Sequence, residues 1–246
     1  MDAMILAAGL GTRLRPLTHH TPKALVEVAG VPMLERVVRR VVDAGADRLV
    51  VNVAHLGEQV ADYVERAGWD VDEVVISEEP GGPYETGGGL KHAAGFFRRD
   101  APFLMHNADI LTNVDLGALY RAHAEAADGR LATLACRAAD TDRYLLFDEG
   151  GLLGYAYGGE EHLKREAQGE PRRLDFCGVQ ACDPELLDIV ADVDEQKFSI
   201  MTTYLRLAGQ GRRIAAFEGR GHTCMDAGTH ERLEEANAAV EAGRIG

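Results

Sequence analysis

Residues 6–25 read LAAGLGTRLRPLTHHTPKAL and begin at the end of a short apolar run, which predicts a buried strand that passes into a tight loop. Gly9 and Gly11 let backbone amides approach an anion, because glycine has no Cβ to block the approach. Arg13 adds a guanidinium and Lys23 an ammonium. The stretch therefore predicts a loop that binds an anionic ligand through amides and two cations.

This loop differs from two widespread phosphate-binding motifs. It lacks the GxGxxG spacing of dinucleotide-binding folds and the GKS or GKT of a Walker loop. Between Asp2 and Glu27 there is no acidic residue, although the whole chain has 40 Asp plus Glu. The absence of acidic residues in this stretch favours an anion-binding site that is neither a dinucleotide-binding motif nor a Walker loop.

Helical and strand periodicities alternate through the first half of the chain, which predicts an α/β fold with a parallel sheet and crossover helices. Strands are expected at residues 3–6, 48–53, 71–77, 102–105 and 131–137. Helices are expected at residues 33–44, 56–67, from 86 or 87 to 97, and 116–127.

The second half has a looser pattern. Residues 144–147 and 152–157 predict an antiparallel ribbon around the turn at Gly150 and Gly151. Residues 158–173 are polar and predict a loop or short helix. Further strands are expected at residues 176–181 and 213–217, and helices at 184–190, 200–208 and 229–242.

Composition excludes several classes of protein. With 26 Lys plus Arg and a formal net charge of -14, the chain is not expected to bind nucleic acid through its phosphate backbone. The sequence has no run of eighteen apolar residues and no signal-peptide pattern, so we expect a cytoplasmic protein without a membrane partner. The four cysteines lack zinc-ligand spacing and are interpreted as buried thiols in a reducing compartment.

Residues 6–25 resemble the sugar-phosphate nucleotidylyltransferase family, whose signature is an AAGxGTRLxPLT segment followed by PKxL. The resemblance continues through residues 84–90, 107–109 and 225–229, and it is greatest to short uridylyl- and guanylyltransferase members with ETGGG-like segments. It implies a Rossmann-like nucleotidyltransferase fold, a mostly parallel mixed sheet flanked by helices, with no C-terminal β-helix. Residues 1–246 are expected to form a single domain, with a nucleotide-binding part at about 1–137 and a sugar-phosphate-binding part at about 138–246.

The same resemblance implies which residues bind the substrates, a nucleoside triphosphate and a sugar 1-phosphate. Arg13 and Lys23 are the expected catalytic residues, because the attacking phosphate is already an anion and the protein must chiefly neutralise charge. Lys23, Phe176 and Gly178 are expected at the sugar phosphate. The expected nucleotide-binding residues are Ala7, Ala8, Gly9, Gly11, Thr12, Arg13, Glu85, Thr86, Gly87 and Asn107.

Asp109 and Asp226 are the expected ligands of one Mg²⁺ ion, which needs only one or two carboxylates besides phosphate oxygens and water. Each stands at a position where the family has an aspartate. Two neighbours depart from the family pattern: Ala108 replaces a glycine, and Cys224 replaces a frequent tryptophan.

Several alternatives stay open at this point. UTP and GTP are both candidate nucleotides. A cytidylyltransferase for a phosphorylated alcohol such as phosphocholine would favour an aromatic cage, and Trp69 is the one tryptophan. A non-catalytic regulatory subunit is the other class. The family's EKP lysine has no match, which leaves Lys164, Arg172, Arg173 and Lys197 as unassigned cations, and a homo-oligomer is compatible with the sequence.

Overall fold

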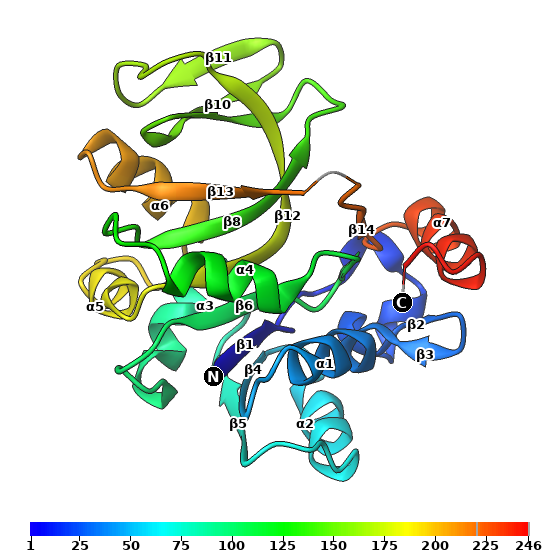
Figure 1. Cartoon of the computed structure of the whole chain (residues 1–246). Helices are drawn as coiled ribbons and strands as arrows, with labels where there is room; N and C mark the ends of the chain where they lie inside the picture. Colours follow the sequence, from blue (N-terminus) through cyan, green and yellow to red (C-terminus); the bar gives the residue numbers. More distant parts are fainter. Residues whose placement is uncertain (220, 246) are drawn as a thin grey trace.

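Parallel strands form the centre of the molecule, as Figure 1 shows for the computed structural model, which describes residues 1–219 and 221–245. They lie side by side in the order β6, β1, β4, β5. Their bounds are β1 (Asp2–Leu6), β4 (Arg48–Val53), β5 (Glu73–Glu78) and β6 (Phe103–Asn107). Because β1 pairs with β4 on one side and β6 on the other, its carboxyl end lies in the middle of the sheet edge.

The sheet continues beyond β6 through antiparallel pairs. β12 (Arg172–Cys182) pairs with β6, and β9 (Tyr144–Asp148), β10 (Gly151–Tyr157) and β11 (Glu160–Leu163) follow it in the upper part of Figure 1. β8 (Ala132–Ala138) also pairs with β12 and carries β13 (Ile214–Glu218) as a parallel neighbour. The mixed α/β sheet expected from the sequence is confirmed.

Helices cover both faces of this sheet. One face carries α1 (Met33–Asp43), α2 (Gly57–Arg66) and α4 (Leu116–Ala124). The other carries α3 (Glu85–Ala93), α5 (Glu185–Ala191) and α6 (Ile200–Gly209). In α1 the residues Leu34, Val37, Val38 and Val41 are all buried, which is the helical spacing from which the helix was expected.

The end of the chain returns to the loop that follows β1. β14 (Cys224–Asp226) forms a ribbon with β7 (Ile110–Thr112), and α7 (His230–Glu241) follows at the right of Figure 1. Leu233 and Ala236 of α7 share an apolar cluster with Leu14 of the loop. The remaining short elements are η1 (Thr12–Leu14), η2 (Leu17–His19), η3 (Lys23–Leu25), β2 (Glu27–Val28), β3 (Val31–Pro32) and η4 (Ala94–Phe96).

One expectation about local structure is wrong. Residues 158–173, expected as a loop or short helix, contain β11, which pairs with the edge of β10, and the start of β12, which pairs with β9. The glycines at 87–89 lie inside α3, within the helix expected from 86 or 87. A Cβ on Gly87 would collide with the ring of Phe198 and one on Gly88 with the backbone of Gln196, so the glycines let α3 pack closely on the segment before α6.

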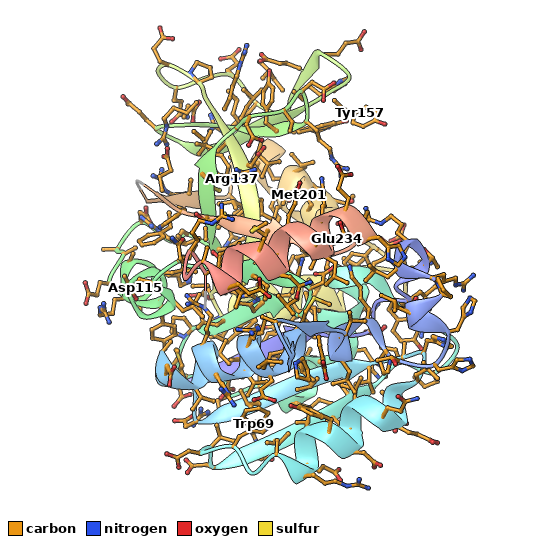
Figure 2. The ribbon with its side chains drawn as sticks, turned by 90° about the vertical axis from the view of Figure 1, so that its right-hand side faces the viewer. Trp69, Asp115, Arg137, Tyr157, Met201 and Glu234 are labelled. Carbon is orange, nitrogen blue, oxygen red and sulfur yellow. A yellow bond between two sulfur atoms is a disulfide. The ribbon has the colours of Figure 1, made fainter. Side chains whose placement is uncertain are left out.

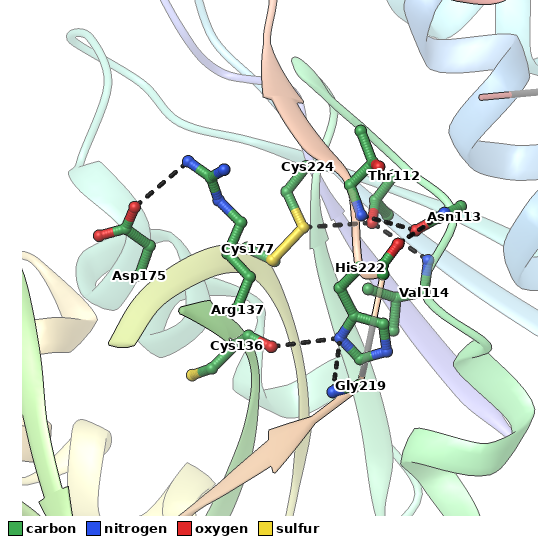
Figure 3. The surroundings of a disulfide bond; sticks show 12 residues. Thr112, Asn113, Val114, Cys136, Arg137, Asp175, Cys177, Gly219, His222 and Cys224 are labelled. Carbon is green, nitrogen blue, oxygen red and sulfur yellow. Dashed lines mark hydrogen bonds and ion pairs between the residues drawn. A yellow bond between two sulfur atoms is a disulfide. The ribbon is translucent and has the colours of Figure 1, made fainter. Parts of the chain in front are cut away.

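The expectation of four free thiols is also wrong. Cys177 of β12 and Cys224 of β14 form a disulfide, with 5.4 Å between their Cα atoms, and Figure 3 shows it at the point where the ribbon meets the sheet. Cys136 and Cys182 are free and buried, as expected. None of the helices within residues 1–219 and 221–245 has the length and apolar character that crossing a membrane requires.

Candidate active site

Two adjoining cavities open where β1 and β6 end. The smaller has a volume of about 250 Å³ and the larger about 1020 Å³. Leu6, Thr86 and Asn107 lie on the walls of both, so the cavities meet at the carboxyl edge of the parallel strands. Ligands of open α/β sheets occupy this edge.

The smaller cavity brings together most of the residues expected to bind nucleotide. Its walls include Ala7, Ala8, Gly9, Glu85, Thr86 and Asn107, together with Lys23 and Asp109. Gly11, Thr12 and Arg13 continue the same loop beyond these walls, and Gly87 packs against Phe198 instead.

Glu85 has an unusual backbone conformation at the edge of this cavity. Its φ of 62° lies in the left-handed region, which few residues with a side chain adopt. The residue is exposed and begins α3. Strained backbone of this kind persists where the surrounding structure holds it, and it is frequent at ligand sites.

The loop after β1 folds back on itself at Gly11. This glycine has a φ of +62°, and a Cβ there would lie 2.8 Å from the Cγ2 atom of Thr18 and 3.0 Å from the Cβ of Lys23. The buried Thr18 hydroxyl donates a hydrogen bond of 2.7 Å to the Gly11 carbonyl. Glycine is therefore needed at this position to bring the loop against the side chains of Thr18 and Lys23.

Lys23 lies between two carboxylates. Its ammonium is ion-paired with Asp109, and its Nζ atom lies 3.9 Å from Oδ1 of Asp226. Arg13 approaches the other oxygen of Asp226 at 3.7 Å. Gly228 lies beside the group, since a Cβ there would be 2.8 Å from the Arg13 guanidinium and 2.9 Å from the Lys23 ammonium. The structure thus brings the expected catalytic cations and the expected metal ligands into one cluster.

A short ribbon brings Asp226 to Asp109. In the pairing of β14 with β7, Asp226 is opposite Ile110, the residue after Asp109. The amide of Ala227 then donates a 3.0 Å hydrogen bond to the Asp109 carbonyl. Asp109 follows β6 as expected, whereas Asp226 lies on a strand outside the main sheet that the sequence did not predict.

The two carboxylates fit a divalent cation. Oδ1 of Asp226 is buried and has no hydrogen-bond partner, whereas its Oδ2 accepts a 2.8 Å hydrogen bond from Arg232. Both carboxylates lie against the Lys23 ammonium, and an orphaned carboxylate oxygen is suited to a hard cation such as Mg²⁺. Phosphate oxygens and water would complete the octahedral shell.

Two of the three residues expected at the sugar phosphate line the larger cavity, whereas the third, Lys23, lines the smaller one. Phe176 and Gly178 line it from β12, whose pairing with β8 is interrupted between Phe176 and Gln180. Gly178 has a φ of +66°, and a Cβ there would lie 2.7 Å from the Cγ1 atom of Ile110. This irregularity lets β12 bend around the cavity beside the β7 ribbon.

Sequence reasoning missed the arginines of this cavity. The cavity is lined by Arg137, Arg143 and Arg232. Arg232 also donates a hydrogen bond to Asp226. The sequence could have indicated Arg232, because this residue lies in the first turn of the helix capped by Thr229 and only six positions after Asp226. Figure 2 labels Arg137 with Met201 and Glu234 in the central part of the molecule.

Three of the four cations that the sequence left unassigned have other partners. The Nζ atom of Lys164 lies 5.5 Å from the centre of the Tyr155 ring, Arg172 is ion-paired with Glu218, and Arg173 with Glu161. None of these cations, nor Lys197, is among the residues that line the two cavities in the described part of the chain.

Trp69, the tryptophan considered for an aromatic cage, lies far from these cavities. It packs against the cluster beneath α2, and Figure 2 places it at the opposite end of the molecule from Tyr157, which lines the larger cavity. The walls of the cavities offer no tryptophan face for a quaternary ammonium within residues 1–219 and 221–245.

Comparison with known proteins agrees with this geometry. Residues 2–144 match the family model described as nucleotidyl transferase. The chain is 37% identical to the N-acetylmuramate alpha-1-phosphate uridylyltransferase of Caulobacter vibrioides over 212 residues, which cover 85% of each chain. It is 32% identical to the protein of the same name from Neisseria meningitidis, over 98% of this chain and 99% of the other. The crystal structure of HddC from Yersinia pseudotuberculosis superposes with a TM-score of 0.75 over 97% of this chain and 99% of that one, at 20% identity, and so shares the fold.

Proposed function

Because this chain belongs to the nucleotidyl transferase family and is a sugar-1-phosphate nucleotidylyltransferase, we propose that it couples UTP to N-acetylmuramate 1-phosphate and releases pyrophosphate. The observation that carries the proposal is the meeting of two cavities at the cluster of Lys23, Asp109 and Asp226. UTP would occupy the smaller cavity, within the part of the chain at about 1–137. The sugar would occupy the larger one, lined mainly by the part at about 138–246.

In the proposed reaction an oxygen of the sugar phosphate attacks the α-phosphorus of UTP. A new phosphorus–oxygen bond forms as the bond to the β-phosphate oxygen breaks, and pyrophosphate leaves in line with the attack. The nucleophile is already an anion, so no side chain has to accept a proton. What the protein supplies is the alignment of two polyanions that repel each other.

The cations of the cluster divide this work by position. Lys23, at the junction of the cavities, would contact the α-phosphate and the incoming sugar phosphate. Arg13, which is more exposed and lies outside the walls of the smaller cavity, would contact the leaving β- and γ-phosphates. Arg232, on the wall of the larger cavity, would contact the sugar phosphate where the family's EKP lysine is missing.

Asp109 and Asp226 would hold a Mg²⁺ ion, which when bound neutralises phosphate charge and orients the triphosphate. Lys23, which is ion-paired with Asp109 in this structure, would contact the phosphate oxygens. The salt bridge between Lys23 and Asp109 keeps both groups in place before the substrates arrive.

The choice of sugar rests on two relatives that are matched over 85% and 99% of their length and on two arginines of the larger cavity. N-acetylmuramate carries a lactyl carboxylate that glucose and mannose lack. Arg137 and Arg143 lie on the cavity wall, and Arg137 is held by Asp175 at 3.2 Å. A guanidinium suits a carboxylate because it can donate two parallel hydrogen bonds.

A panel assay tests the proposed function. Pyrophosphate release would be measured for UTP, GTP, CTP and ATP, each with the 1-phosphates of N-acetylmuramate, N-acetylglucosamine, mannose and glucose, with Mg²⁺ and with a chelator. We expect the UTP and N-acetylmuramate pair to have the highest kcat/KM and the chelator to abolish turnover. A preference for GTP and mannose 1-phosphate would show that the protein is a guanylyltransferase instead. No turnover with any pair would support a regulatory subunit.

A further inference from the structure

Two buried polar side chains connect the loops on either side of the smaller cavity. Asn52 lies near the end of β4 and is 2% exposed, and Glu79 follows β5 and is 4% exposed. Buried asparagine and glutamate are costly unless their polar atoms are hydrogen-bonded. Neither residue belongs to the signature from which the site was expected.

The hydrogen bonds form a continuous chain between two backbone amides. The Ala7 amide donates to Oδ1 of Asn52 at 2.8 Å, and Nδ2 of Asn52 donates to Oε1 of Glu79 at 2.6 Å. Oε2 of Glu79 accepts the Tyr84 amide at 2.7 Å. Ala7 belongs to the phosphate loop, and Tyr84 directly precedes the strained Glu85.

Only one arrangement of these groups satisfies every donor. The Ala7 amide needs an acceptor, which fixes the oxygen of Asn52 on that side and its amino group toward Glu79. The amino group in turn needs a carboxylate oxygen, and the Tyr84 amide needs the other. Burial raises the pKa of the Glu79 carboxyl, while the hydrogen bonds from Tyr84 and Asn52 lower it.

Gly89 leaves the space that this pair requires. A Cβ at this position of α3 would lie 2.7 Å from Nδ2 of Asn52 and 2.7 Å from Oε1 of Glu79. The third glycine of the run in α3 therefore serves the pair of polar side chains rather than a ligand. Any larger residue would separate Asn52 from Glu79 or lift the helix.

We propose that Asn52 and Glu79 are positioning residues, which hold the amide of Ala7 and the amide of Tyr84 at a fixed separation and thereby set the affinity for the nucleotide. Asn52 also lines the smaller cavity, but its polar atoms and those of Glu79 are hydrogen-bonded to the protein, so we expect both side chains to act through the loops that they hold. The inference rests on the proposed function in one respect, namely that the smaller cavity binds the nucleotide.

The chemistry of the pair allows a swap experiment. Asn52→Asp alone places two carboxylates together, and Glu79→Gln alone leaves either Asn52 or Tyr84 facing an amino group. The double variant Asn52→Asp/Glu79→Gln restores every bond, because Asp at 52 accepts from Ala7 and from the new amide, whose oxygen accepts from Tyr84. It also keeps one buried carboxylate. Thr133→Val is the matched control, since it removes a buried hydrogen bond to His123 away from both cavities.

KM for UTP, KM for the sugar phosphate, kcat, the equilibrium affinity for UTP and the unfolding midpoint would be measured for all variants. Each single variant should weaken UTP binding about tenfold, with kcat and KM for the sugar phosphate changed less than about threefold. The double variant should return to within about threefold of the wild type. Thr133→Val should lower the unfolding midpoint and leave UTP binding unchanged.

Three results would overturn the inference. In the first, the single variants bind UTP as tightly as the wild type. In the second, the double variant folds but binds UTP as weakly as the single variants. In the third, the affinities for both substrates fall equally and in proportion to the unfolding midpoint. If a single variant does not fold, the UTP affinity of the double variant decides alone. Wild-type turnover with UTP in the same assays tests the proposed function separately, and a wild type that binds no nucleoside triphosphate would contradict both.

Discussion

The ammonium of Lys23 is ion-paired with the carboxylate of Asp109, although 86 positions separate them in the sequence. This contact joins the loop after β1 to the end of β6, at the junction of the two cavities. Asp226 faces the same ammonium from the β14 ribbon. Each carboxylate of the cluster therefore lies against a cation of the protein, Asp109 against Lys23 and Asp226 against Lys23 and Arg13.

Arg13→Ala should lower kcat by about a hundredfold with little change in stability, because the guanidinium acts on charge that develops on the leaving phosphates. Its side chain is 60% exposed, so its ion pair with Asp226 adds little to the free energy of unfolding. Arg66→Ala, which removes an exposed pair with Asp62 on α2, is the control. Steady-state kinetics with both substrates saturating gives the comparison, and equal kcat in the two variants would remove Arg13 from the catalytic residues.

Asp109→Asn and Asp226→Asn should each lose most activity at low Mg²⁺ and recover partly as Mg²⁺ rises, because one carboxylate is left to hold the ion. The binding of Mn²⁺ in place of Mg²⁺, measured by its electron paramagnetic resonance signal in the presence of UTP, should weaken by about tenfold or more. Asp62→Asn on the surface of α2 should leave both readouts unchanged. Unaltered Mn²⁺ binding in both active-site variants would place the metal elsewhere.

Stability should fall as the pH drops from about 6.5 toward 4. Burial lowers the pKa of His106 and of His123 to about 4, from 6.5 in the unfolded chain. Below 6.5 the unfolded chain therefore takes up protons that the folded chain does not, and the free energy of unfolding decreases by about 2 kcal/mol per histidine by pH 5. Urea unfolding between pH 5 and 7.5 measures this loss.

His123→Gln tests whether His123 causes part of this loss of stability at low pH, since glutamine can keep the hydrogen bond to Thr133 but cannot titrate. The variant should lose less stability between pH 7.5 and 5 than the wild type does. Identical pH dependence in the two proteins would show that His123 is not responsible.

Reduction of the disulfide should destabilise the protein without unfolding it at neutral pH. Cys177 and Cys224 are 47 positions apart, and closing a loop of that length is worth about 4 kcal/mol in the chain-entropy model. Chemical unfolding with and without dithiothreitol should differ for the wild type and for Cys136→Ala, but not for Cys177→Ala/Cys224→Ala. Four reactive thiols in the denatured, unreduced protein would contradict the cross-link.

The sequence was sufficient for the central sheet and for the residues of the cluster. Apolar runs such as residues 48–53 are buried on both faces of the sheet, so their composition alone identifies them. Asp109 could be placed at the strand end because β6 is such a run. The loop of residues 6–25 could be interpreted because it resembles the AAGxGTRLxPLT and PKxL signature of the family.

Other features depend on contacts between distant segments and leave little trace in the local pattern. β7 and β14 are three residues long each, which is too short for a periodicity, yet their pairing carries Asp226 to Asp109. Gly87 was interpreted as a nucleotide contact because Phe198, against which it packs, lies more than a hundred positions away in the sequence. Asn52 could have been singled out from the sequence, because it is a polar residue inside an otherwise apolar strand.

The most direct test of the central claim is the rate of nucleotide-sugar formation by Lys23→Met, which keeps the apolar stem of the side chain but removes its charge. With Mg²⁺, UTP and N-acetylmuramate 1-phosphate, the wild type should form the nucleotide sugar and pyrophosphate in equal amounts. Lys23→Met should be slower by at least about a hundredfold, while Lys164→Met, whose ammonium lies over Tyr155, should match the wild type. A folded Lys23→Met that keeps a wild-type rate would contradict the assignment of phosphate transfer to the Lys23, Asp109 and Asp226 cluster.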